Sequence, residues 1–120
     1  MGYLLYGPFM PFAAGRYHAT FTLRRQGVAA SPETVVAVLD AHADGDDPCI
    51  ARREIRAAEL PPGRWMPMTL QFEVSTLRWP GQLRVHSPGV EALAVDTTVV
   101  VDDRDSAVWP PAARLAAPAD

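Results

Sequence analysis

One stretch near the N-terminus carries the clearest structural signal: Gly7-Pro8-Phe9-Met10-Pro11-Phe12-Ala13-Ala14-Gly15-Arg16-Tyr17-His18-Ala19-Thr20-Phe21-Thr22-Leu23-Arg24. Its first half is turn sequence, because Pro8 and Pro11 fix φ and lack the N–H donor that a regular helix needs. Its second half alternates apolar and polar residues without a break from Arg16 to Arg24. A period of two predicts a β-strand over residues 16–25 with one buried side and one solvent-facing side.

A second clean alternation covers residues 65–74. Here Met66, Leu70 and Phe72 share one side of the expected strand, and polar residues share the other. Pro67 lacks a ladder donor, so we expect it at a sheet edge or at the start of a strand. The apolar sides of the two strands are expected to meet in one core, with Phe21 and Phe72 buried in it.

The rest of the chain is divided into short elements by Pro and Gly turns. A helix competes with a strand near residues 32–43, since Ser31 suits a helix N-cap, but the β-branched run favours a strand. Turns are expected at 43–48, with its Asp-Gly pair, at 61–63 and at 78–81. Further strands are expected at these ranges: 3–6, 35–42, 49–57, 82–86 and 93–102.

Six or seven short strands and no clear helix predict an all-β fold, an antiparallel β-sandwich of the jelly-roll type. The sandwich domain is expected to span residues 1–103. Periodicity is then lost, and residues 104–120, which are rich in Pro and Ala, are expected to form a C-terminal tail or linker.

Size and charge narrow the function classes. The 120 residues suit one domain with a single core. A formal net charge of −3 argues against a general binder of nucleic acid or of anionic membranes. The lone Cys49 excludes an intrachain disulfide. No signal peptide and no membrane-spanning run is visible, which favours the cytoplasm.

The opening stretch resembles the "G-P-Y-x-x-L-P-A-G-R-Y-x-V-x-F" opening of galactose-binding-like β-sandwich modules. Leu39-Asp40 with Ile50-Ala51-Arg52-Arg53, and the central strand at 68–74, are similar to later parts of that family. The family includes carbohydrate-binding modules and accessory domains of bacterial glycosyltransferases. The resemblance implies a non-catalytic sugar-binding or accessory domain, with a saccharide ligand and a fused or associated sugar-processing enzyme as partners. Its matching positions are turn and core residues, so no binding residue carries over from the motif.

The polar sides of the expected strands carry the candidate ligand contacts. If these strands share one sheet, its face presents an aromatic plane, an Arg, two His and an amide, a mixture that suits saccharide hydroxyls and C–H faces. The alternatives are an ordinary solvated sheet face and a protein-interaction or homodimer surface. The candidate contact residues on these strands are His18, Trp65, Gln71, Arg84 and His86, and Trp79 in the expected turn at 78–81 is a second candidate for stacking on a sugar.

Metal sites have little support in the sequence. The acidic turn Asp44, Asp46, Asp47 lacks the ligand loop of an EF-hand. The resemblance to galactose-binding-like modules implies Asp96 as the place for a structural Ca²⁺, but an Asp that hydrogen-bonds a turn is the interpretation we favour. The histidines His18, His42 and His86 fall on separate expected strands without the usual zinc spacing. We expect no metal and no cofactor.

Catalysis also has little support. The chain has no G-x-S-x-G, H-E-x-x-H or phosphate-loop motif. Asp40 could form the carboxylate pair of a glycosidase with either Glu54 or Glu73, but nothing in the sequence places either pair across a cleft. Cys49 has no identifiable activating base. We therefore expect a protein that is not an enzyme.

Overall fold

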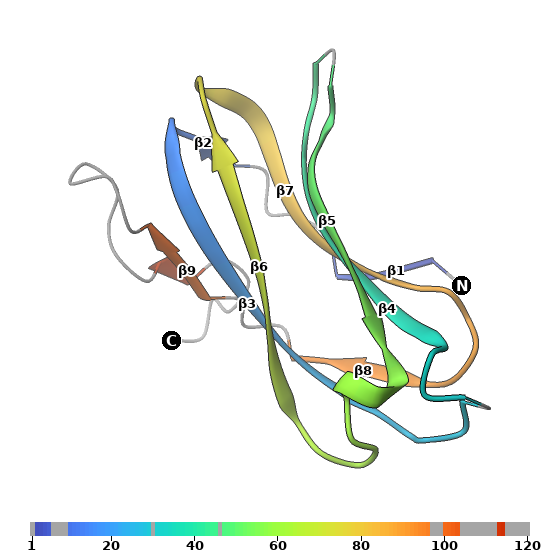
Figure 1. Ribbon diagram of the computed structural model, residues 1–120. Helices are drawn as coiled ribbons and strands as arrows, with labels where there is room; N and C mark the ends of the chain where they lie inside the picture. Colours follow the sequence, from blue (N-terminus) through green and yellow to red (C-terminus); the bar gives the residue numbers. More distant parts are fainter. Residues whose placement is uncertain are drawn as a thin grey trace.

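The computed structural model describes residues 2–5, 10–29, 31–45, 47–96, 100–103 and 113–114. Within these residues the strands form two five-stranded antiparallel sheets, called sheet A and sheet B below (Figure 1). The predicted all-β antiparallel class is confirmed. The one short helical turn among them is η1, a 3₁₀ turn at Ala57–Glu59.

Sheet A has the order β1-β7-β4-β5, and β2 also pairs with β7. Residues 35–43 form a strand, not the competing helix, because β4 lies between β5 and β7 and both neighbours satisfy its backbone groups. The strands of sheet A are β1 (Gly2–Leu5), β2 (Met10–Phe12), β4 (Val35–Ala43), β5 (Cys49–Arg56) and β7 (Arg78–Ser87).

Sheet B has the order β10-β9-β3-β6, and β8 also pairs with β3. The two alternating stretches of the sequence are the neighbours β3 and β6, and Pro67 lies on the edge strand, as expected. The strands of sheet B are β3 (Gly15–Arg25), β6 (Met66–Val74), β8 (Leu93–Val95), β9 (Val100–Asp103) and β10 (Ala113–Arg114).

Two sequence predictions need correction. Residues 78–81 are not a turn but the first part of β7, with a cis peptide bond between Trp79 and Pro80. Pairing with β2 overrides the Pro-Gly turn signal, because Met10 lies opposite Gly81 and Phe12 opposite Arg78. The expected strand at 93–102 is two strands, β8 and β9, which pair with different parts of β3.

Part of the sequence lies outside the described residues. These include positions 97–99, between β8 and β9, and most of the expected tail at 104–120. Of that tail, Ala113–Arg114 is described, and it pairs with β9 as β10.

The apolar sides of both sheets contribute to one buried cluster. Phe21 and Phe72 are both buried, as predicted. Three aromatic rings pack together across the two sheets. Tyr17 and Phe72 of sheet B stack with ring centroids 5.0 Å apart, and the ring centroid of Phe12, on β2 of sheet A, lies 5.5 Å from that of Phe72. The Tyr17 hydroxyl donates to the Ala13 carbonyl at 2.6 Å, which closes the turn sequence onto the start of β3.

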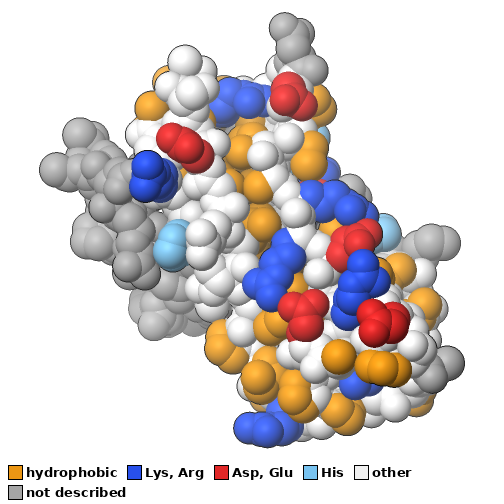
Figure 2. All heavy atoms as spheres, viewed as in Figure 1, with side chains coloured by type: hydrophobic (Ala, Val, Ile, Leu, Met, Phe, Trp, Pro, Cys, Tyr) orange, Lys and Arg blue, Asp and Glu red, His pale blue; other side chains and the backbone are white. Residues whose placement is uncertain are grey.

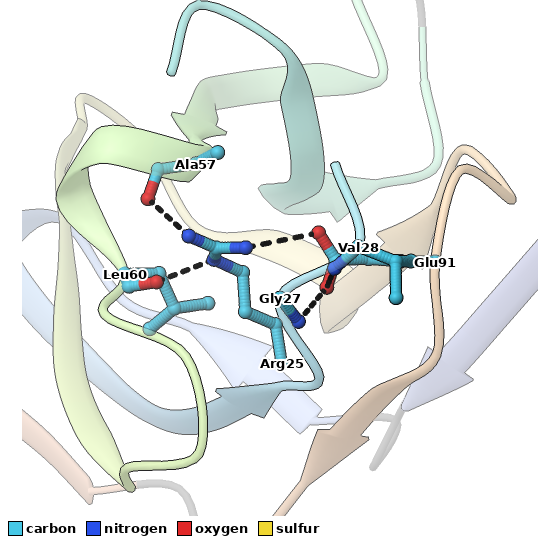
Figure 3. Close-up of polar contacts among 6 residues, drawn as sticks. All are labelled: Arg25, Gly27, Val28, Ala57, Leu60 and Glu91. Carbon is cyan, nitrogen blue, oxygen red and sulfur yellow. Dashed lines mark hydrogen bonds and ion pairs between the residues drawn. The ribbon is translucent and has the colours of Figure 1, made fainter. Parts of the chain in front are cut away.

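A buried guanidinium connects the ends of several elements (Figure 3). Arg25, the last residue of β3, occupies an inward position and is 9% exposed. It donates from Nε to the Leu60 carbonyl, from Nη2 to the Ala57 carbonyl at 3.1 Å, and from Nη1 to Glu91 Oε2 at 3.2 Å. The Arg25 side chain thereby joins sheet B to the η1 turn, which follows β5 of sheet A.

Glu91 extends this connection to the loop after β3. Its Oε1 accepts the N–H groups of Gly27 at 2.6 Å and of Val28 at 3.3 Å. Gly27 has φ +99°, and a Cβ there would lie 2.5 Å from Pro62 Cβ, so a larger residue does not fit. Arg25, Glu91 and the loop at 26–28, called the Arg25 hub below, therefore form one interlocked unit.

The edge strands β5 and β6 lie side by side, and one side chain connects them. Arg53 of β5 donates from Nη1 to the Thr69 carbonyl of β6 at 2.6 Å and from Nη2 to Glu59 at 2.8 Å. Both contacts come from the same guanidinium, so the edge of sheet A is held against the edge of sheet B.

We predict that the Arg25 hub makes stability depend on pH. Burial alone raises the pKa of Glu91, but the Gly27 and Val28 N–H groups and the Arg25 guanidinium outweigh it and lower that pKa below its ordinary 4.5. A carboxylate with a lowered pKa stabilises the fold fully above pH 4.5, and this contribution is lost as the pH falls through the lower folded-state value.

Urea unfolding of the wild type and of Glu91→Gln tests this at pH 7 and at steps down to pH 3. At pH 7 we expect the variant to lose about 1.5–3 kcal/mol, typical of hydrogen bonds to a charged group. The difference should shrink below pH 4.5. A difference that is constant with pH would contradict the assignment.

Candidate functional site

A hollow of about 240 Å³ lies over the start of β3 and the end of β6. It is lined by Arg16, Tyr17, His18, Gln71, Phe72 and Glu73. The side chains of Tyr17 and Phe72 are buried in the core, so their strand neighbours point to the outer face of sheet B. The register places Arg16 opposite Glu73 and His18 opposite Gln71. Figure 2 shows a histidine close to one basic and one acidic side chain on this side of the molecule.

The polar groups of the hollow differ in chemistry. Arg16 is a donor, Glu73 an acceptor, Gln71 both, and the His18 ring carries two nitrogens. Arg16 and Glu73 carry opposite charges and lie across from each other on the two strands. Together these two side chains therefore add no net charge to the hollow. This set favours a polar, hydroxyl-bearing ligand over a strongly charged one.

The same face continues along the two strands. Thr20 and Thr69 lie opposite each other, and their Oγ1 atoms are hydrogen-bonded at 3.1 Å. At the far end the Arg24 guanidinium lies over the Trp65 ring, with Cζ 4.8 Å from the ring centroid. Trp65 is 47% exposed. Two of the predicted contacts, His18 and Gln71, therefore lie together in the hollow, with Trp65 further along the same face.

The other three predicted contacts lie on sheet A. Arg84 and His86 are on β7 and alternate with its buried residues, and Trp79 is at the start of the same strand, 58% exposed. The condition that the strands carrying these residues share one sheet is therefore not met, and Trp79 lies in β7 and not in the expected turn. The two groups of strands belong to different sheets, and β7 does not pair with β3 or β6 in the described residues.

On sheet A the charged groups face each other. Arg84 donates from Nε to Asp40 Oδ1 at 2.7 Å and from Nη2 to Oδ2 at 2.8 Å. Both side chains are mostly buried. Two residues further along β4, His42 lies opposite Gln82, and within the part of the chain that the structure describes its buried Nδ1 has no hydrogen-bond partner. The two charged groups Asp40 and Arg84 are thus committed to each other within the sheet.

Three residues of the site were not predicted: Arg16, Arg24 and Glu73 were not among the candidate contacts. The two alternating stretches contain the signal that finds them. If β3 and β6 are taken as antiparallel neighbours, opposite charges fall at Arg16 and Glu73, and Arg24 falls close to Trp65. Cross-strand pairs of this kind are the ordinary unit of sheet stabilisation.

A second hollow, of about 200 Å³, lies beside the Arg25 hub. Its lining is mostly small side chains, with Arg25 as the charged group. Each nitrogen of that guanidinium already donates to a protein acceptor. We therefore assign this hollow a structural role.

The other residues considered from the sequence do not converge. Asp40 is paired with Arg84, Glu54 with Arg52 and Arg56, and Glu73 lies on the other sheet. Asp44, Asp47 and Cys49 are exposed, and Asp46 lies outside the described residues. The described part of the chain holds no group of three or more His, Cys, Asp or Glu side chains placed to bind a metal.

Comparisons with known proteins gave no match: no family model, no curated protein and no solved structure matches this chain. Among the described residues, no helix has the length and apolar character needed to cross a bilayer.

We predict that Asp40 and Arg84 are strongly coupled. Asp40→Ala leaves a mostly buried guanidinium without its bidentate partner and should cost about 2–4 kcal/mol. The double variant Asp40→Ala/Arg84→Ala removes both charges and should cost clearly less than the sum of the single variants. Chemical denaturation of the four proteins measures this. Additive costs would show that the pair contributes no coupling.

Proposed function

We propose that this chain is a non-catalytic carbohydrate-binding module that binds its saccharide in the hollow of sheet B. The observation that carries the proposal is the pairing of His18 with Gln71, and of Arg16 with Glu73, around one hollow. Planar polar groups that both donate and accept suit sugar hydroxyls, which themselves do both. Balanced charge and a net charge of −3 favour a neutral sugar over a nucleic acid or an anionic surface.

We also propose that the two sheets form a β-sandwich of a particular type. Two antiparallel sheets whose apolar sides share one core support a β-sandwich. The galactose-binding-like jelly roll is the particular sandwich proposed, on the strength of the Gly7–Phe21 resemblance. That resemblance also favours an accessory role beside a bacterial glycosyltransferase, or another sugar-processing enzyme, fused to or associated with this chain.

A glycan array tests the proposal, with the wild type and matched variants. We expect His18→Ala/Gln71→Ala to lower the affinity for the bound glycans at least about tenfold, since two hydrogen-bonding side chains are lost. The matched control is His86→Ala, which removes a histidine from sheet A and should leave binding unchanged. Loss of binding in His86→Ala but not in the double variant would overturn the assignment to sheet B. A wild type that binds no glycan would overturn the function.

A protein-interaction or oligomerisation module is the second candidate. The observation that favours it is the exposed apolar pair before and within β7, Leu77 at 65% and Trp79 at 58%. Between them, Arg78 donates from Nη2 to the carbonyls of Ala43 and Asp47, at 3.2 and 2.8 Å. These bonds hold Arg78, which lies between the two apolar residues, to the β4–β5 hairpin, and exposed apolar and aromatic residues are typical of interaction surfaces.

Sedimentation equilibrium tests the second candidate. If Leu77 and Trp79 form a self-association surface, the wild type should be dimeric, and Trp79→Ala should raise the dimer dissociation constant at least about tenfold. Trp65→Ala, which removes a tryptophan of similar exposure from sheet B, is the control. A wild type that is monomeric at high concentration would contradict self-association through this pair.

A further inference from the structure

We infer that the ligand of the proposed site is an extended saccharide chain that lies along β3 and β6, from the hollow to Trp65. This inference rests on the proposed function. It adds the ligand's class, a linear oligosaccharide, and its direction along the two strands.

The first support is a continuous polar path. The buried positions of β3 and β6 alternate with outward ones along the whole pair. The outward pairs follow each other in register without a bulge. Starting from the hollow they are Arg16–Glu73, His18–Gln71, Thr20–Thr69 and Thr22–Pro67.

The second support is the small size of the side chains in the middle of this path. Thr20, Thr69, Thr22 and Pro67 have short side chains, whereas both ends carry long ones. The Thr20 and Thr69 hydroxyls bond to each other at 3.1 Å and still have acceptor capacity, because each hydroxyl oxygen has two lone pairs. A chain of sugars therefore meets hydroxyl groups between the two ends, where the outward side chains of β3 and β6 are short.

The third support is the far end, where an aromatic ring and a guanidinium lie together. Arg24 lies over the Trp65 ring and restrains it, and Trp65 as a residue remains 47% exposed. An exposed indole offers a flat apolar surface to the C–H side of a pyranose, and Arg24 supplies donors beside it. The path thus ends in a second place where a sugar unit gains contacts.

The distance between the ends sets the ligand's length. Arg16 and Arg24 are eight residue steps apart on β3, which is about 26 Å at about 3.3 Å per residue. This is several times the width of one pyranose ring. A monosaccharide reaches only one end, whereas an oligosaccharide of several units contacts both.

Calorimetric titration with defined oligosaccharides tests the inference. The probes are the xylo-, manno-, malto-, cello- and chito-oligosaccharide series, each from the monosaccharide to the hexasaccharide. In a series that binds, we expect the hexasaccharide to bind at least about tenfold more tightly than the disaccharide. Trp65→Ala should abolish this gain and leave the affinity for short sugars unchanged. Trp79→Ala, a tryptophan variant on sheet A, should retain the gain, and circular dichroism should show that both variants fold.

The possible results distinguish failure of the extended ligand from failure of the proposed function. If affinity depends on His18 and Gln71 but not on chain length, the proposed function stands and the extended ligand is overturned. The same holds if Trp65→Ala weakens all lengths equally or none. If none of these series binds at any length and the wild type also binds no glycan on the array, both the proposed function and the extended ligand are overturned.

Discussion

The buried guanidinium of Arg25 is the interaction on which the arrangement of the two sheets depends. Taking a charge out of water is costly, so a buried Arg is tolerated only when its donors and its charge are satisfied. Here the Ala57 and Leu60 carbonyls come from the turn after β5, the Glu91 carboxylate comes from the loop between β7 and β8, and Arg25 itself ends β3. These three segments must therefore be in place together. Because Glu91 also holds Gly27 and Val28, the loop that leaves β3 is fixed by the same carboxylate.

A fixed β3 has consequences for the outer face of sheet B. The register of β3 and β6 is set by their buried sides, where Tyr17 stacks on Phe72 directly across the strand pair. A slip of one residue would bring these rings out of the core and turn His18 and Gln71 into it. The position of the candidate ligand groups is thus a by-product of core packing. Groups held on paired strands are also better preorganised than groups on loops, so less entropy is lost when a ligand binds.

The sequence predicted the strands well where one physical signal dominates. Alternation between apolar and polar residues identified β3 and β6 and the burial of Phe21 and Phe72, because that pattern follows directly from the pleat. It failed where pairing partners decide the outcome. The Pro-Gly pair at 80–81 lies within β7, since β2 pairs with it, and the stretch at 93–102 divides because β3 binds its two parts at different positions. The candidate contacts fall on two sheets for the same reason: Arg84 and His86 have the same local pattern as His18 and Gln71, and local pattern does not state which sheet a strand joins.

The outer faces of the two sheets differ in how their polar groups are used, and this difference favours sheet B as the ligand face. On sheet A, Asp40 and Arg84 satisfy each other in a mostly buried bidentate pair, and a ligand would have to break that pair to bind either group. On sheet B the opposed side chains surround a hollow, and the Thr20–Thr69 contact joins two groups that retain acceptor capacity. Binding at these two hydroxyl groups therefore adds contacts, whereas binding to the Asp40–Arg84 pair exchanges them. Exchange of a charged bidentate pair for contacts with a neutral sugar is unfavourable, because it leaves a buried charge less well paired.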